Sequence, residues 1–158
     1  MIKDLNKLAR KIIQENQYVT IATSDKNGNP WISAVVYAYD KDWNFYFISI
    51  PSSKHCQNIK NNKRVVVAIF DSHQLLGEGV GLQIEGEAIM VDIKDTPKVA
   101  TIYFGRKYPY GKVAHNAGQY IKRFMKKGEL YRFYKIRQTT FWMNDPNSKI
   151  DLRVEVKL

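Results

Sequence analysis

Hydrophobic and polar residues alternate along most of this chain with the period of a β-strand. The alternation is clearest over residues 81–91 (GLQIEGEAIMV), where an apolar or small residue occupies every second position. Because successive side chains of a strand point to opposite faces, this pattern predicts a strand with one buried face. Runs rich in β-branched and aromatic residues predict six further strands, at residues 18–24, 31–39, 45–50, 65–70, 130–143 and 152–158.

Two connections between these strands have the composition of tight turns. Residues 25–29 carry Asn27 and Gly28 at their centre, a pair typical of short β-hairpin turns. Residues 40–42 (DKD) connect the next two strands in the same way. Inside the strand at 81–91, Gly86 predicts a bulge or a close approach of another backbone.

Apolar residues at helical spacing, with capping residues before them, predict four helices between the strands. Asp4 is the expected N-cap of the first helix and Ser52 that of the second. Pro97 lies at an early position of the third, where proline is tolerated. The predicted helices are residues 4–15, 52–62, 95–107 and 113–127.

The order of these elements predicts one domain over residues 1–158. Strands arranged as hairpins, with helices inserted or flanking, indicate a mainly β (α+β) fold built as an antiparallel barrel of six to seven strands. A chain of this length can bury about 70% of the surface that its unfolded form exposes. No internal repeat or linker divides the sequence.

Cysteine usage and hydropathy predict where the protein works. Cys56 is the only cysteine, so no disulfide forms within the chain and a reducing compartment is expected. No apolar run approaches the roughly 20 residues of a membrane span, and residues 1–16 lack the apolar block of a signal peptide. We therefore expect a cytoplasmic protein without a membrane partner. The three histidines have no metal-ligand spacing, so no metal is predicted.

The net charge of +10 is concentrated in residues 98–137, which hold eleven Lys and Arg residues and one acid, Glu129. Such a segment can meet nucleic acid, a membrane surface or an anionic small molecule. Aromatic residues interleave with the basic ones and could stack the bases of a single strand. They can equally be core residues beside a solvated helix face, and no known nucleic-acid module is present, so nucleic acid is the less favoured partner.

The expected start of the second helix has the composition of a phosphate site. Ser52, Ser53 and Lys54 place two hydroxyls and an ammonium group beside the free N–H groups of a helix N-terminus. These groups favour a phosphate monoester. From the residues alone, Ser52 can equally be a simple cap and Lys54 a solvated side chain.

The strand–turn–strand order, followed by S-S-K-H-x-x-N-I-x-x-N and a third strand, resembles the FMN-binding split-barrel proteins related to pyridoxamine 5′-phosphate oxidase. The resemblance extends from about Tyr18 to Val91 and implies a split β-barrel that binds FMN. It places Ser33, Ala34, Val35 and Val36 along the flavin ring, and Ile48, Ser49, Ser52, Ser53 and Lys54 at the ribityl-phosphate end. It also implies Gln83 near the flavin, although a solvent-facing glutamine fits that position as well.

The resemblance further implies a homodimer that binds two flavins between its subunits. In similar proteins late aromatic residues reach the partner's cofactor, and Trp142 matches that position. The strands at 31–39 and 130–143 also hold more apolar residues than one small barrel interior needs, which predicts an interface. These residues are Trp31, Val35, Tyr37, Phe133 and Trp142.

Departures from pyridoxamine 5′-phosphate oxidase itself narrow the expected activity. Ile32 and Ser53 stand where that enzyme has arginines, and residues 151–158 lack its substrate-binding motif. We therefore expect an FMN-dependent oxidoreductase with another small-molecule electron donor or acceptor, anionic molecules being among the candidates, and no side chain is assigned as catalytic. The alternatives are a non-enzymatic flavin-binding stress or sensor protein, a deazaflavin or haem ligand, and a nucleic-acid binder that uses the basic segment.

Overall fold

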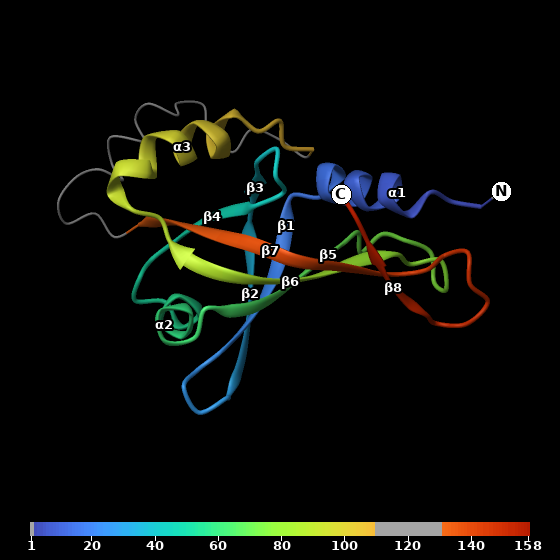
Figure 1. Ribbon diagram of the computed structural model, residues 1–158, viewed down its shortest axis with the longest axis horizontal. Coiled ribbons are helices and arrows are strands. Elements are labelled where there is room, and N and C mark those ends of the chain that lie inside the picture. Colours follow the sequence, from blue (N-terminus) through green and yellow to red (C-terminus); the bar gives the residue numbers. More distant parts are fainter. Residues whose placement is uncertain (1, 110–130) are drawn as a thin grey trace.

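A computed structural model describes residues 2–109 and 131–158. Its described part holds one antiparallel sheet of eight strands. Seven follow one another in the order β2-β1-β5-β6-β7-β4-β3, and β8 pairs with β7. Figure 1 shows the sheet coiled so that β1 and β2 cross the direction of β7. The expected antiparallel split barrel with flanking helices is confirmed, and the strands are β1 (Tyr18–Ser24), β2 (Pro30–Val36), β3 (Ala38–Tyr39), β4 (Phe45–Ser49), β5 (Arg64–Phe70), β6 (Gly81–Met90), β7 (Arg132–Asn144) and β8 (Arg153–Val156).

Tyr37 interrupts the strand predicted at 31–39. Its ring is fully buried, and its hydroxyl donates to the carbonyl of Ile13 at 2.6 Å. The residues before it form β2 and pair with β1, whereas the two residues after it form β3 and pair with β4. The single predicted strand thus supplies both ends of the sheet order, and this change of partner opens the split of the barrel.

The first helix, α1 (Leu5–Glu15), begins as predicted. The Asp4 carboxylate accepts a hydrogen bond from the backbone N–H of Lys7 at 3.1 Å, which satisfies one of the free donors of the first turn. The helix buries Ala9, Ile12 and Ile13 and lies against β5, β6 and β8. The C-terminus lies beside this helix (Figure 1).

The second helix, α2 (Lys54–Asn61), begins one residue later than predicted. Its N-cap is Ser53 rather than Ser52, and the Ser53 hydroxyl makes no capping hydrogen bond. The turn before the helix closes through a backbone bond from Ser53 N–H to the Ile50 carbonyl at 2.9 Å. That bond moves the cap forward by one residue and leaves Ser52 exposed.

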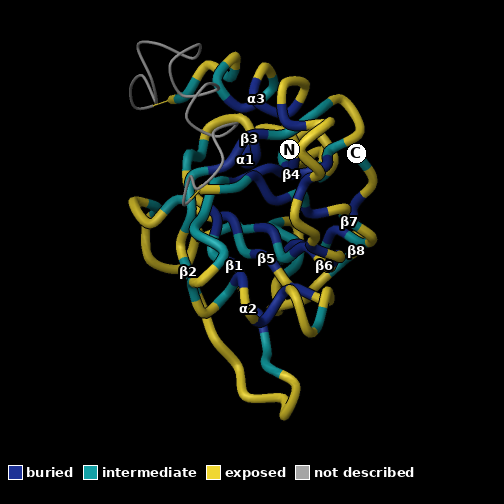
Figure 2. The backbone as a smooth tube through the Cα atoms, turned by 90° about the vertical axis from the view of Figure 1, so that its left-hand side faces the viewer, coloured by how far each residue is buried: buried dark blue, intermediate teal, exposed yellow. Residues whose placement is uncertain are grey.

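Two clusters of apolar side chains fill the fold. The larger one lies inside the barrel under α1 and α2, with Phe45, Phe47 and Ile84 among its members. The smaller one packs the helix α3 (Thr96–Gly105), which follows a short 3-10 turn at Ile93–Asp95, against β4 and β7. Figure 2 shows buried residues on the strands and exposed ones on the turns and outer helix faces. The helix predicted at 113–127 lies outside the described residues.

The glycines at the predicted turn and bulge behave as expected. Gly28 has a φ of 83°, the left-handed conformation that a tight hairpin turn requires. At Gly86 the pairing of β6 with β7 shifts by one residue, so Thr139 becomes the extra residue of a β-bulge. A Cβ atom at Gly86 would lie 2.6 Å from the carbonyl oxygen of Arg137. The two backbones are therefore too close here for a residue with a side chain.

Candidate functional site

Three serine hydroxyls from different elements gather around His55 in the first turn of α2. The His55 Nδ1 lies 3.2 Å from the Ser33 Oγ of β2, and its Nε2 lies 2.8 Å from the Ser49 Oγ of β4. The Ser53 Oγ is 3.3 Å from that of Ser49. Because β2 and β4 are not paired neighbours in the sheet, the imidazole bridges the two sides of the split.

Lys54 holds its charge beside this cluster. Its Nζ lies 4.4 Å from the centre of the Trp31 ring, a cation–π contact that limits where the ammonium group can go. The Trp31 ring is 42% exposed, and its Nε1–H donates to the Ser33 Oγ at 3.1 Å. The Trp31 side chain therefore contacts both Lys54 of the predicted phosphate site and Ser33 of the predicted ring site.

A buried thiol lies beneath the cluster. Cys56 is 2% exposed. Burial, the largest influence, raises its pKa, but the hydrogen bonds that it receives, first that of His55, outweigh burial and lower the pKa overall. Tyr134, whose ring stacks on Phe47 at 5.1 Å, has its pKa raised by burial and by its hydrogen bond with Cys56.

The remaining residues expected to contact the flavin point to two sides of the sheet. Val35 packs against the larger core cluster and Ile48 against the smaller one. Ala34 and Val36 lie on the face of β2 opposite Val35, in register with Thr20 and Tyr18 of β1, and Val36 packs against the smaller cluster as Ile48 does. Backbone groups of β2 can therefore meet a ring at this edge, but most of these side chains cannot meet it together.

Gln83 and Trp142 lie far from the serine cluster within one chain. They are register partners on the outer face, in β6 and β7. The Gln83 Oε1 is buried and has no partner among the described residues. The pairing row runs from Ala34 through β1, β5 and β6 to Trp142. Four strand spacings of about 4.8 Å separate its ends by about 19 Å along the sheet.

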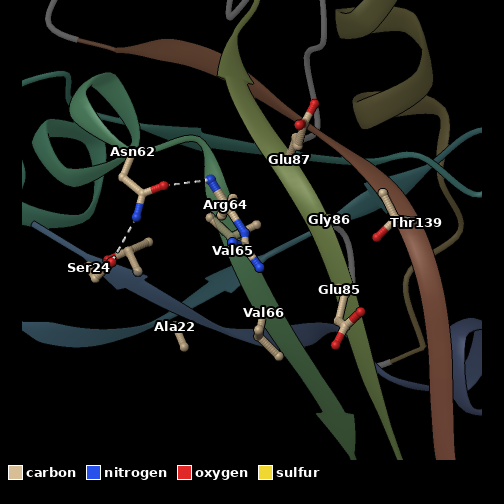
Figure 3. Close-up of a pocket in the computed structure, with 11 residues that line it drawn as sticks. Ala22, Ser24, Asn62, Arg64, Val65, Val66, Glu85, Gly86, Glu87 and Thr139 are labelled. Atoms are coloured by element: carbon tan, nitrogen blue, oxygen red, sulfur yellow. Dashed lines mark hydrogen bonds between the residues drawn. The ribbon is translucent and has the colours of Figure 1, made fainter. Parts of the chain in front are cut away.

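A separate groove of about 530 Å³ follows the β-bulge on the outer face (Figure 3). Figure 3 shows Arg64, Glu85 and Glu87 along it, with Asn62 bonded to Ser24 at 2.9 Å at one end. Glu87 is held in an ion pair with Arg137 at 2.8 Å. None of the residues expected to bind flavin lines this groove.

In the described part of the basic segment, several cationic side chains already have partners within the chain. Arg106 turns inward and donates to carbonyls of α1, and Arg137 is paired with Glu87. Lys135 lies 5.9 Å from the centre of the Tyr46 ring. The paired lysines and arginines of residues 122–127 lie outside the described residues, so their expected position over the site stays a prediction.

The structure thus brings together Ser33, Ser49, Ser53 and Lys54, leaves Ser52 exposed at the edge, and separates Gln83 and Trp142 from them. Sequence reasoning missed His55, the residue at the centre. Its only signal was its place directly after Ser-Ser-Lys, because its partners Ser33 and Ser49 lie on strands that meet only in the folded barrel. Within residues 2–109 and 131–158 no group of acidic, histidine or cysteine side chains could hold a metal ion.

Comparison with known proteins places the chain in a family. A family model described as Pyridoxamine 5′-phosphate oxidase matches residues 5–126. The chain belongs to the pyridoxamine 5′-phosphate oxidase family. No curated protein matches it.

Among the described helices, none is long and apolar enough to cross a membrane.

Solved structures share the fold at low sequence identity. A protein of unknown function from Agrobacterium tumefaciens is 18% identical with a TM-score of 0.70; the match covers 95% of this chain and 60% of that one. A protein related to general stress protein 26, from Clostridium acetobutylicum, is 13% identical with a TM-score of 0.67, over 98% of this chain and 94% of that one. The haem storage protein HutZ from Vibrio cholerae is 14% identical with a TM-score of 0.62, over 87% and 92%.

Proposed function

We propose that the chain binds FMN at the split of the barrel and acts as a flavin-dependent oxidoreductase with an unassigned substrate. The observation that carries this proposal is the convergence of three hydroxyls, Lys54 and the N-terminus of α2 at one point. Hydroxyl and ammonium donors beside a helix N-terminus suit a phosphate monoester, which is the charged end of FMN.

The residues present fit the parts of FMN in a consistent order. Ser49, Ser53 and Lys54 would hold the phosphate, and the backbone of β2 from Ser33 to Val36 would run along the ring. The bound flavin would supply the electron-transfer chemistry. The chain's own contribution is to bind, orient and shield it, so no side chain is assigned as an acid or base.

The charge on Lys54 should decide affinity for the phosphate. Lys54→Ala removes a charge-assisted contact that contributes about 1.5–3 kcal/mol. We expect FMN affinity to fall about tenfold or more, since ~1.4 kcal/mol is a factor of ten. Riboflavin, which lacks the phosphate, should bind both proteins equally. Titration followed by flavin fluorescence measures both ligands.

Lys60→Ala is the matched control, because Lys60 is an exposed lysine in the last turn of the same helix. It should leave both affinities unchanged. Equal losses for FMN and riboflavin in Lys54→Ala would place the phosphate elsewhere.

A two-fold dimer would complete the flavin site. The predicted set of interface residues is partly wrong, because Tyr37 and Phe133 are buried within the chain. The outer face of β1, β2 and β5 carries other exposed apolar side chains, Tyr18, Ile32, Val66 and Phe70, at 56%, 66%, 46% and 55% exposure. A second copy on this face would cover them and bring its own Gln83 and Trp142 toward the first copy's β2.

A charge on this face should separate the subunits. Val66→Arg places a cation where the partner's apolar face would pack, so we expect the mass measured by light scattering to fall from two chains to one. FMN affinity should fall with it. Leu76→Arg, in the exposed loop before β6, is the control and should remain dimeric. A monomeric parent protein that still binds FMN tightly would contradict this assembly.

Haem is the second candidate ligand, since HutZ shares the fold. The two described histidines both have engaged rings: His55 contacts serine hydroxyls, and the His73 Nδ1 lies 2.9 Å from the Asp71 carboxylate in an exposed loop. That arrangement favours flavin. The absorption spectrum of the purified protein distinguishes the two, and turnover with a nicotinamide donor distinguishes an enzyme from a flavin-binding sensor.

A further inference from the structure

We infer that His55 is a positioning residue that orients the hydroxyl donors of the phosphate site, and that it does so with its proton on Nε2. The inference rests on the proposed function, because it describes how that site is prepared for an anion. It depends on the direction of the hydrogen bonds that connect Trp31, Ser33, His55, Ser49 and Ser53.

The bond from Trp31 has a fixed direction. An indole N–H is only ever a donor, and it donates to the Ser33 Oγ at 3.1 Å. Ser33 has one proton of its own, and the His55 Nδ1 lies 3.2 Å from its Oγ. The Ser33 Oγ therefore accepts from Trp31, and its own proton is directed to Nδ1 when Nδ1 accepts; the other geometry, in which Nδ1–H donates to the second lone pair of this oxygen, belongs to the opposite tautomer considered below. In a neutral imidazole whose Nδ1 accepts, the proton lies on Nε2.

The same direction continues across the split. Nε2–H donates to the Ser49 Oγ at 2.8 Å, and the Ser49 hydroxyl can donate onward to the Ser53 Oγ at 3.3 Å. The Ser53 hydroxyl makes no capping bond, and a protonated Nε2 does not accept from it, so its proton can go to an anion at the start of α2 or to the Cys56 thiol below. Hydrogen bonds aligned in one direction polarise one another, which strengthens the last donor.

The opposite tautomer would undo this arrangement. With the proton on Nδ1, Nε2 would accept the only proton of Ser49 or of Ser53, whose Oγ lies 3.4 Å away. At most one of the two hydroxyls could then donate to an anion, whereas both keep a proton for it when Nε2 carries the proton. The Phe47 ring packs beside the imidazole, with its centre 6.0 Å from that of His55 at an angle of 49°.

The first experiment measures the tautomer without any ligand. ¹⁵N-histidine-labelled protein is examined by long-range ¹H–¹⁵N correlation above the pH at which imidazoles ordinarily lose their charge. We expect the His55 Nε2 to show the shift of a protonated nitrogen and Nδ1 that of an unprotonated one. His55→Gln identifies the signals by removing them. A proton on Nδ1 would overturn the inference.

The second experiment measures what the donors do for the phosphate. His55→Leu removes both ring hydrogen bonds and should weaken FMN binding about tenfold, as expected for loss of one charge-assisted donor, while riboflavin binding changes little. His55→Gln can place an amide N–H near the position of Nε2 and should restore most of the FMN affinity. His73→Gln, in the exposed loop, is the control and should bind as the parent protein does.

The outcomes separate this inference from the proposed function. If the parent protein binds neither FMN nor riboflavin, the proposed function fails, and the tautomer measurement still tests the bond direction. If FMN binds but His55→Leu loses FMN and riboflavin equally, or His55→Gln is as weak as His55→Leu, then His55 supports the fold only and the positioning role is wrong.

Discussion

Replacing Arg106 with methionine is expected to lower the free energy of unfolding by about 3 kcal/mol. The guanidinium group donates to three backbone carbonyls, those of Tyr37, Ile13 and Asn16, the last two at 3.0 and 2.6 Å. Ile13 and Asn16 lie at the C-terminal end of α1, where carbonyls lack helical partners and a cation is favourable. Methionine keeps the apolar stem but leaves most of these carbonyls unpaired, at about 1–3 kcal/mol for each buried group.

Three tyrosine rings hold the guanidinium in place, which is why lysine should not substitute for it. The Arg106 Cζ lies 4.2 Å from the Tyr37 ring centre, 5.0 Å from that of Tyr39 and 4.9 Å from that of Tyr108. A lysine ammonium carries its three donors on one nitrogen and cannot reproduce the planar fork whose Nη1 and Nη2 reach different carbonyls, so Arg106→Lys should recover less than half of the loss. Urea denaturation measures all variants, with the exposed neighbour Lys107→Met as control. A loss below about 1 kcal/mol for Arg106→Met would contradict this account.

Gly86→Ala should destabilise the protein by about 2–3 kcal/mol, the upper part of the ~1–3 kcal/mol range typical of forced overpacking. The new methyl group would lie 2.6 Å from the Arg137 carbonyl oxygen and 3.1 Å from the Ile136 Cγ2. A backbone carbonyl in a paired strand cannot move away cheaply, so β6 and β7 would have to separate at the bulge. Thermal or chemical unfolding measures the effect.

Gly79→Ala is the matched control for this substitution. A Cβ atom at Gly79 meets no atom within 4 Å. Its unfolding free energy should therefore stay within about 0.5 kcal/mol of the parent value. If both alanine variants behave alike, the close approach at Gly86 does not govern stability.

The strands and turns could be predicted because their signals are local. Alternation over residues 81–91 follows directly from which side chains of β6 face the core, and Asn27-Gly28 needs only its own turn. The bulge at Gly86 was also predictable, because glycine inside a strand has few other uses. These features require no knowledge of distant residues.

The features that sequence reasoning missed depend on contacts between distant residues. The break at Tyr37 comes from its hydroxyl reaching Ile13, and nothing in the apolar run 31–39 marks it. Arg106 looked like one more charge of a basic segment, although it is bound to α1. His55 joins two strands that approach only because the barrel curls, so its role was invisible in the motif that contains it.

The placement of β7 has a consequence for how the protein is made. This strand pairs with β4, β6 and β8, yet it comes from near the end of the chain. At a synthesis rate of about 5–20 residues per second, the edges of β4 and β6 stay unpaired for seconds before β7, the strand that pairs with both, leaves the ribosome. Unpaired strand edges invite intermolecular pairing. Nascent chains that stop before Arg132 should therefore depend on chaperones far more than the finished protein does.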